Sequence, residues 1–362
     1  MESKIDTTAF SGWGLDVRRP LIIAGPCSAE TEEQVLETAR RLKKSTPTQI
    51  FRAGIWKPRT RPNSFEGVGV KGLKWLKSVK EETGLLTTTE VANAQHVYES
   101  LKYGVDMLWI GARTTVNPFT IQEIANALSG VDIPIFIKNP VNPDVDLWIG
   151  SIERLQKCGI SRIAAVHRGF SSFSESRYRN EPNWQVPIEL KRLRPDLPMI
   201  CDPSHISGRR SLLQEVSQKA MDLNFDGLMI ETHPDPDNAW SDARQQITPE
   251  QLSELLDHLI LRKTDPGTNG VLSKLEELRG EIDRLDRELL NILESRMRVA
   301  AGIGQCKKES GITILQPTRW DSIISRYMEL GRSKGLSDEF IRTLFMAIHE
   351  ESINTQTKIM NE

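Results

Sequence analysis

The sequence predicts an α/β protein, a (β/α)8 barrel of the TIM-barrel type, followed by a small all-α helical domain. Short apolar runs alternate with helix-like segments over the first part of the chain, and polar or charged residues follow each run. A linker-like segment then precedes a region of strong helical periodicity. These observations predict a barrel domain over residues 1–262, a linker at 263–270 and a helical domain over 271–362.

The predicted strands are apolar on both faces, which is typical of a parallel sheet covered by helices. They lie at 21–24, 49–51, 85–89, 107–110, 135–137, 162–166, 199–201 and 227–230. Segments with helical periodicity lie between most of them, at 33–43, 73–80, 94–101, 121–128 and 212–221. Eight such units fit a closed barrel. An open doubly wound sheet is the alternative, but no GxGxxG follows the first strand.

Composition and charge indicate a soluble globular protein and exclude several classes. Hydrophobic residues make up 38% and charged residues 27% of the 362 positions, which are ordinary values. The net charge of −2 excludes a general nucleic-acid-binding coat. No apolar run approaches the roughly 18 residues of a membrane span, and residues 1–10 lack the apolar core of a signal peptide. The four cysteines are far apart, which indicates reduced thiols in a cytoplasmic protein. The charge and the lack of an apolar span together predict no nucleic-acid and no membrane partner.

Basic residues cluster behind the predicted strands. The segment 51–61 alone contains four cations and no acidic residue, and a proline inside it stiffens the backbone. Because the carboxyl ends of barrel strands meet at one face, we expect these cations to converge. Such a set needs a multiply charged ligand or acidic neighbours, which indicates a phosphorylated carboxylate; a solvated surface position is the alternative for each cation alone. The predicted anion-binding residues are Arg52, Lys57, Arg113, Lys138 and Arg168.

Four further residues at the same predicted face form a candidate metal site. Cys27 follows the first run, His205 the seventh and Glu231 the eighth, and Asp242 lies in the segment beyond. One sulfur, one nitrogen and two oxygen donors suit manganese, iron, cobalt or zinc better than calcium or magnesium. Each has an alternative role: packing for Cys27, a hydrogen bond to a carbonyl for His205 and an ion pair with arginine for Glu231.

Seven motifs in order carry a resemblance to a known enzyme family. They are GPCS at 25–28, R-x4-KPRT at 52–60, GAR at 111–113, KNP at 138–140, HRG at 167–169, DPSH at 202–205 and IETHPDP…SDARQQ at 230–246. Over residues 10–262 the chain resembles the type I-beta 3-deoxy-D-arabino-heptulosonate 7-phosphate (DAHP) synthases. The resemblance implies condensation of phosphoenolpyruvate with erythrose 4-phosphate and a divalent metal ion, Mn2+ first, with Fe2+, Co2+ or Zn2+ as alternatives. A sister family that uses arabinose 5-phosphate typically has a KANRS-like segment at the position of KPRT, which favours the four-carbon aldehyde here.

The resemblance also implies roles for individual residues. The implied metal ligands are Cys27, His205, Glu231 and Asp242. The implied contacts to phosphoenolpyruvate are Arg113, Lys138 and Arg168 near its phosphate, and Arg52, Lys57 and Lys138 near its carboxylate. Arg59 and Thr60 are expected to meet the sugar phosphate. Lys57 also stands where a proton donor to the aldehyde oxygen is needed, and we treat this role as a hypothesis.

After the linker, apolar residues recur at alternating intervals of three and four along a long helix that begins near Leu275, which predicts a seam that packs on another helix. Gly311 and Pro317 separate it from a second helix at 320–334, and Ser337 caps a third that runs to about residue 358. Three helices form a thin bundle, so we expect dimerisation through them to bury more of their surface.

Cation spacing in the helical domain suggests a site for a dianion. Arg296 and Lys307 are 11 positions apart, close to three turns and roughly 16 Å along the axis, so their side chains can reach one ligand. Arg279 is 17 positions before Arg296, roughly 25 Å away, and can join only from an antiparallel partner chain. Solvated surface cations are the alternative interpretation.

A second resemblance covers residues 271–359. The segment LRGEIDRLDRELLNILESRMRVAAGIGQCKK and the segment ESINTQ at 351–356 resemble the first and last helices of the all-helical chorismate mutases, which convert chorismate to prephenate. The implied catalytic residues are Arg296, Lys307, Arg319 and Gln356 of one chain with Arg279 of its partner, and Ser352 is a lesser contact. The family usually has D-P-x-R-E around the middle arginine, whereas this chain has Gln316 and Trp320 at the acidic positions.

Together the two resemblances predict a bifunctional shikimate-pathway enzyme. The alternative is that the helical domain is mainly a dimerising sensor of chorismate or prephenate, with weak mutase activity. The two functions can hold together, and we then expect prephenate to inhibit the synthase. A metal-dependent barrel aldolase of another specificity is a third reading, and it requires the seven motifs to be coincidental.

Overall fold

A computed structural model describes residues 10, 13, 15, 20–57, 65–172, 176–262, 269–315 and 317–361, with the side chains of 269 and 317–322 left out. The chain divides into two compact units, Met1–Thr264 and Asp265–Glu362, which we describe separately. The predicted linker at 263–270 lies mostly outside the described residues, so the exact domain limits stay a prediction.

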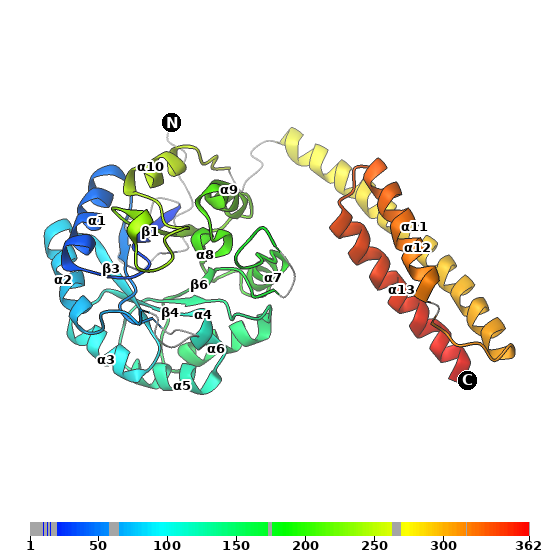
Figure 1. Cartoon of the computed structure of the whole chain (residues 1–362), viewed down its shortest axis with the longest axis horizontal. Coiled ribbons are helices and arrows are strands. Elements are labelled where there is room, and N and C mark those ends of the chain that lie inside the picture. Colours follow the sequence, from blue (N-terminus) through cyan, green and yellow to red (C-terminus); the bar gives the residue numbers. More distant parts are fainter. Residues whose placement is uncertain are drawn as a thin grey trace. The chain divides into compact units, whose positions relative to one another are not determined.

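The first unit is a closed barrel of eight parallel strands in sequence order (Figure 1). β1 pairs with β2 and also with β8, where Leu21 lies opposite Gly227, and this pairing closes the barrel. The strands are β1 Leu21–Gly25, β2 Ile50–Arg52, β3 Leu86–Val91, β4 Met107–Ile110, β5 Ile135–Lys138, β6 Ile163–His167, β7 Met199–Cys201 and β8 Gly227–Glu231. All eight predicted strands are confirmed, and the doubly wound alternative is excluded because the sheet has no open edge.

Helices surround the strands as an outer ring (Figure 1). Side chains at residues just before several helices accept backbone N–H groups, which explains where these helices begin; examples are Thr31, Asn93, Asn117, Asp144 and Thr248. The α-helices are α1 Glu32–Ser45, α2 Lys71–Thr83, α3 Ala94–Lys102, α4 Ala112–Thr115, α5 Pro118–Ala127, α6 Val145–Lys157, α7 Gln185–Leu193, α8 Pro203–Ser207, α9 Leu213–Asp222 and α10 Pro249–Asp257. Two short 3-10 turns are η2 Arg210–Leu212 and η3 Pro236–Asn238.

The barrel has two apolar layers. One fills the space between the strands and the helices, and the other fills the barrel interior with residues such as Ile23, Trp109 and Phe136. Trp13 packs on Phe136 with ring centroids 5.6 Å apart, so part of the N-terminal segment joins the interior layer. The interior is therefore a packed core, and polar side chains gather where the strands end.

The second unit consists of α11 Asn269–Glu309, α12 Pro317–Ser333 and α13 Asp338–Asn361. α11 and α13 approach closely at Gly304, where an added Cβ would lie 3.1 Å from Gln356 Cα. α12 and α13 share a stacked pair, Tyr327 and Phe345, with ring centroids 4.3 Å apart. The Ser337 hydroxyl accepts the N–H of Phe340, which caps α13 as predicted.

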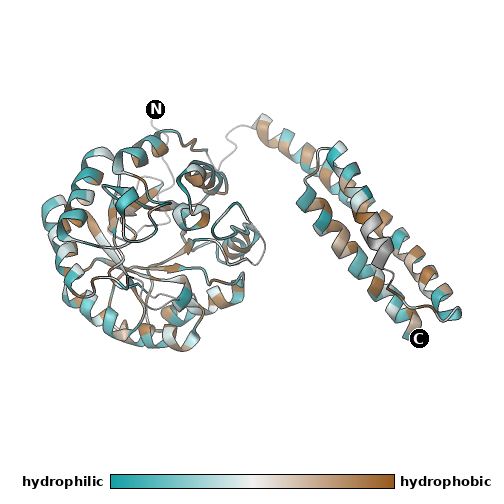
Figure 2. Ribbon diagram, viewed as in Figure 1, coloured by the Kyte–Doolittle hydropathy of each residue, from teal (hydrophilic) through white to brown (hydrophobic). Residues whose placement is uncertain are grey.

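Apolar residues lie along α11 at positions that the unit itself does not cover (Figure 2). They include Leu275, Leu278, Ile282, Leu285, Leu289 and Ile292, the residues of the predicted seam. Ile292 is 65% exposed and Leu285 is 48% exposed. A contiguous apolar stripe of this kind favours a further helical partner. Among the described helices, none combines the length and apolar character that a membrane crossing requires.

Candidate active sites

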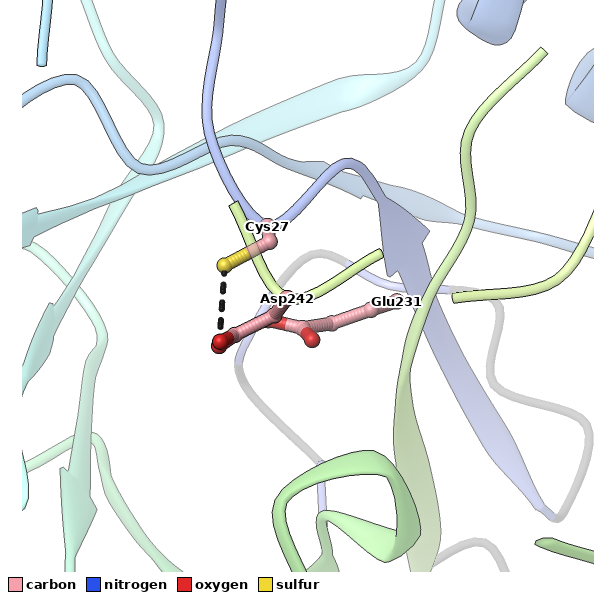
Figure 3. Close-up of side chains that lie close together, drawn as sticks. All are labelled: Cys27, Glu231 and Asp242. Carbon is pink, nitrogen blue, oxygen red and sulfur yellow. Dashed lines mark hydrogen bonds between the residues drawn. The ribbon is translucent and has the colours of Figure 1, made fainter. Parts of the chain in front are cut away.

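Three predicted metal ligands meet at one end of the barrel (Figure 3). Cys27 follows β1, Glu231 ends β8 and Asp242 lies in the loop beyond β8; one ligand atom of each lies within 4.8 Å of the other two. The Cys27 thiol lies 3.4 Å from Asp242 Oδ2. Gly25 makes the approach possible, because a Cβ there would collide with the Arg52 carbonyl and its φ of 146° disfavours other residues.

His205 belongs to the same cluster. It lies in α8, directly after β7, with Nε2 3.6 Å from Glu231 Oε1 and 3.9 Å from Asp242 Oδ2. Its other nitrogen, Nδ1, lies 2.8 Å from Asp202 Oδ2. The nearby negative charge favours a proton on Nδ1, which leaves Nε2 free to bind a metal ion. All four predicted ligands therefore lie together.

The chemistry of this cluster fits a divalent metal ion. Glu231 Oε1 is buried and accepts no hydrogen bond from the described residues, although Arg52 Nη2 lies 3.3 Å away. Burial, reinforced by the charge of Glu231, raises the pKa of the Cys27 thiol to about 12. A buried thiol beside two carboxylates becomes a thiolate only if a strong positive charge is added, which a bound divalent cation supplies.

The predicted cations converge around this cluster. Lys57 Nζ lies 3.0 Å from Cys27 Sγ. Arg52 is buried behind Glu231, and Lys138 Nζ makes a buried ion pair with Asp202 Oδ2 at 2.7 Å. The expected repulsion among the cations is thus reduced in part by carboxylates of the site itself.

A cavity of about 300 Å³ lies beside the candidate metal ligands, a volume suited to a small ligand. Its lining includes Glu90, Arg113, Lys138, Arg168, Asn180 and His205. Burial lowers the pKa of Arg168 to about 10; Asp202 opposes the shift, and the charges of Arg179 and Arg113 add to it. Because these cations disfavour one another, an anion in the cavity would be bound strongly.

Several residues of the site were not predicted. Asn180 accepts from Arg168 Nη1 at 2.7 Å and donates to the His205 carbonyl at 2.6 Å. Arg179 Nη1 lies 3.0 Å from Asp242 Oδ1, and Gln245 donates to Glu231 Oε2 at 2.6 Å. The two glutamines of SDARQQ were part of a recognised motif, but Arg179 and Asn180 lie in a polar loop where the sequence gives no signal of a buried site. Arg59 and Thr60 lie outside the described residues.

In the helical unit, α11 and α13 bring four predicted residues together. Arg296 Nη1 donates to the Ser352 hydroxyl, and Lys307 Nζ donates to Gln356 Oε1 at 3.1 Å. Ser352 and Gln356 are buried, so two polar side chains lie inside the bundle beside two cations. Arg296 and Lys307 thus contact different residues of α13, and a ligand shared by the two cations stays a prediction.

The other predicted residues of the helical unit lie elsewhere. Arg279 is exposed and pairs with Glu276 of its own helix at 2.8 Å. Arg319 lies in α12, but neither its side chain nor that of Trp320 is among those described, and Gln316 is also outside the described residues.

Comparison with known proteins assigns both units. The model of the DAHP synthetase I family matches residues 6–265. The chain belongs to this family. A second family model, chorismate mutase type II, matches residues 278–357. The chain is therefore an enzyme that contains both a DAHP synthase domain and a chorismate mutase domain, and both families belong to the shikimate pathway.

Individual relatives support the assignment of the barrel. A phospho-2-dehydro-3-deoxyheptonate aldolase from Thermotoga maritima is 32% identical over 238 residues, which span 66% of this chain and 68% of the relative. The crystal structure of a DAHP synthase from Thermotoga maritima matches with a TM-score of 0.60 at 30% identity, over 68% of this chain and 70% of that one. A 2-dehydro-3-deoxyphosphooctonate aldolase from Vesicomyosocius okutanii is 28% identical over 65% of this chain and 87% of its own length.

Proposed function

We propose that the barrel condenses phosphoenolpyruvate with erythrose 4-phosphate to give DAHP. The observation that carries this proposal is the convergence of Cys27, His205, Glu231 and Asp242 with cations that line a cavity of about 300 Å³. A phosphorylated carboxylate of three carbons fits such a cavity in both size and charge.

The cations would bind the two charged groups of phosphoenolpyruvate, with Lys138 near both. Arg113, Lys138 and Arg168 line the cavity and would bind the phosphate of phosphoenolpyruvate. Arg52 lies beside Glu231 and Lys57 beside Cys27, and these two residues together with Lys138 would hold its carboxylate. Arg59 and Thr60 would meet the phosphate of the aldehyde substrate. Fixed cations of this kind stabilise charge in the transition state without reorganisation.

The reaction forms one carbon–carbon bond. C3 of phosphoenolpyruvate attacks the aldehyde carbon, the aldehyde oxygen takes up a proton, water adds at C2, and the C2–O bond to phosphate breaks so that inorganic phosphate leaves. Lys57 would donate the proton, since its Nζ lies 3.0 Å from Cys27 Sγ and therefore beside the candidate metal ligands. A divalent ion held by Cys27, His205, Glu231 and Asp242, with Mn2+ our first choice, would supply Lewis-acid polarisation of the aldehyde.

The choice of aldehyde has two candidates, because the relatives include both heptonate and octonate aldolases. We propose the four-carbon sugar, since the sequence has KPRT at 57–60, where the octonate enzymes typically have a KANRS-like segment. The test follows loss of phosphoenolpyruvate with erythrose 4-phosphate or arabinose 5-phosphate, with and without a chelator. Consumption with neither sugar in the presence of Mn2+ would contradict the proposal.

We further propose that the helical unit converts chorismate to prephenate as a homodimer. Arg296, Lys307 and Gln356 lie together, and Lys307 with Gln356 would face the ether oxygen whose bond breaks. Arg319, with a lesser contact from Ser352, would complete the site within one chain. Arg279 would come from the partner, and the exposed seam of α11 supports such a dimer.

A second candidate function is a sensor of chorismate or prephenate with weak turnover. Gln316 and Trp320 favour it, because they stand where the mutases usually have acidic residues that can hold the substrate hydroxyl. Chorismate turnover by the full chain, measured beside the synthase assay, decides between the two. Prephenate inhibition of the synthase that persists after deletion of residues 263–362 would remove a regulatory role for this unit.

A further inference from the structure

The loop that carries Asp242 is closed at its base. The N–H of His233 donates to the Ile247 carbonyl at 2.9 Å, and the N–H of Ile247 donates to the Glu231 carbonyl at 3.2 Å. Within the loop, Asp242 has a φ of 50°. A non-glycine residue in this left-handed region costs about 1–2 kcal/mol, so the surrounding structure must hold it there.

The segment after β1 provides three of the contacts that hold this loop, and Arg210 adds others from outside this segment by donating to the carbonyls of Ala243 and Gln246. The Cys27 N–H donates to Gln246 Oε1 at 3.0 Å, and the hydroxyls of Ser28 and Ser241 are hydrogen-bonded to each other. The third contact comes from the Glu30 carboxylate. The loop is therefore fixed to the segment that also carries Cys27.

Glu30 uses both of its carboxylate oxygens on the loop. Oε1 accepts the backbone N–H of Trp240 at 2.7 Å, two residues before Asp242. Oε2 lies 3.3 Å from His233 Nε2, at the beginning of the loop. His233 Nδ1 accepts the N–H of Asp235 at 3.0 Å, so the proton of the neutral ring is on Nε2 and is donated to Glu30.

This carboxylate is almost fully inside the protein. The side chains of Glu30 and His233 are each 5% exposed. In the described part of the chain, no lysine or arginine lies within ion-pair distance of Glu30, so hydrogen bonds from the loop are what compensate its burial. Burying this carboxylate costs free energy, and both of its oxygens contact one loop. These two facts indicate that Glu30 serves to hold that loop.

We propose that Glu30 is a positioning residue for the candidate metal centre. It touches none of the four candidate ligands itself. It holds the beginning of the loop through His233 and the approach to Asp242 through Trp240, and so places the Asp242 carboxylate beside Cys27 and Glu231. The inference rests on the metal site of the proposed function and adds a residue outside the predicted set.

A glutamine at position 30 tests this arrangement with little change in shape. Its single oxygen can accept only one of the two N–H groups, and its amide then presents an N–H to the other. The mismatch falls either at Trp240 or at His233, and in both cases the loop loses one contact. Glu37→Gln, on the exposed surface of α1, removes the same charge without touching the loop and is the matched control.

In the experiment, the chelator-treated full-length chain is titrated with Co2+. Calorimetry and the thiolate-to-cobalt absorption band both monitor binding. We expect the parental chain to show the band, Cys27→Ser to lose it, and Glu37→Gln to bind as the parental chain does. For Glu30→Gln we expect about a tenfold or greater loss of Co2+ affinity, with the band recovered at saturation. Circular dichroism of each metal-free variant verifies that it is folded.

Co2+ affinity of folded Glu30→Gln within twofold of the parental value would overturn the proposal. If Glu30→Gln does not fold, His233→Leu replaces it, because this variant removes one of the two contacts between Glu30 and the loop and keeps the Glu30 carboxylate. Weakened Co2+ binding by His233→Leu then supports the proposal, and unchanged binding overturns it. If the parental chain gives no thiolate-to-cobalt band, the proposed metal site itself is wrong. If the parental chain gives the band and Glu30→Gln binds Co2+ equally well, only the role of Glu30 is wrong.

Discussion

Lys138 Nζ and His205 Nδ1 share one oxygen, Asp202 Oδ2, at distances of 2.7 and 2.8 Å. A cavity-lining cation and a candidate metal ligand are thus oriented by the same buried carboxylate. Burial opposes ionisation of Asp202, but the charges of His205 and Lys138 hold its pKa well below the usual range. Asp202 therefore links the cavity to the candidate metal ligands.

Asp202→Asn is expected to affect both sites at once. Its amide keeps the shape but removes the charge that Lys138 and His205 share, so Mn2+ affinity should fall about 10- to 100-fold and the KM for phosphoenolpyruvate should rise. Calorimetry measures the first effect and steady-state kinetics the second. Asp132→Asn, at an exposed ion pair with Arg162, is the control. A change in only one of the two quantities would contradict the coupling.

Lys57→Met tests the proposed proton donor. We expect kcat of the synthase to fall by about 100-fold or more, because methionine fills the space without offering a proton. Lys74→Met, on the exposed face of α2, should retain parental kcat. A Lys57→Met rate within a few fold of the parental rate would show that another group, or water, delivers the proton.

Metal removal should separate the two activities of the chain. Chelation is expected to abolish DAHP formation, since the proposed Lewis acid is lost, and to leave chorismate turnover unchanged, since that reaction relies on positioning and fixed charges. Both activities are measured on the same sample before and after addition of Mn2+. Loss of both upon chelation would mean that the metal also supports the fold or the helical unit.

The proposed mutase site, shared between two chains, predicts complementation between two inactive variants. Arg279→Ala and Arg296→Ala are each expected to be inactive alone, but a mixed dimer has one site with Arg296 of one chain and Arg279 of the other. After equal mixing, unfolding and refolding, about one quarter of the parental turnover should return. Prephenate formation measures it, with each variant refolded alone as the control. No recovery despite confirmed mixed dimers would place Arg279 outside the site.

His167 should make the stability of the barrel depend on pH. Burial, then the charge of Arg168, lowers the pKa of His167 to about 3, with Trp184 and Phe225 against its ring. In the unfolded chain the His167 ring takes up a proton near pH 6.5, whereas in the folded chain it stays neutral. The stabilising contribution of neutral His167 to the free energy of unfolding is therefore complete above pH 6.5 and is lost as pH falls. Between pH 7 and 5 we expect a loss of about 2 kcal/mol from this residue.

The measurement compares urea unfolding of the parental chain and of His167→Phe at pH 7 and pH 5, with tryptophan fluorescence as the signal. This signal reports mainly on the barrel, because seven of the eight tryptophans precede residue 263. The variant should lose less stability over this range. The exposed His258, changed to glutamine, is the control. Equal losses in the parental chain and His167→Phe would show that other groups dominate acid sensitivity.

The strands and their order could be predicted from the sequence because each is buried on both faces and is followed by a polar motif. β5 shows why: Ile135–Ile137 is wholly apolar, and Lys138 follows directly. The four candidate metal ligands were found through motif resemblance, since residues as distant as Cys27 and Asp242 give no signal by spacing alone. In the helical unit, the spacing of Arg296 and Lys307 allows a shared ligand, because one helix fixes the distance between its own residues, but the resemblance to the chorismate mutases is what singles them out.

The supporting residues could not be predicted in this way. Glu30, Arg179 and Asn180 act through loop geometry, and a loop path is set by contacts between distant segments that no local pattern encodes. Asp242 illustrates the limit: its left-handed backbone is imposed by the anchored loop and is not preferred by the residue itself.

The pairing of β1 with β8 has a consequence for how the enzyme is made. Cys27 follows the first strand, whereas Glu231 and Asp242 belong to the last strand and the loop beyond it. A nascent chain on the ribosome, before β8 emerges, contains only Cys27 and His205 of the four candidate ligands. The proposed four-residue metal site can therefore be completed only at the end of barrel synthesis, and a polypeptide that terminates before β8 lacks both of its carboxylates.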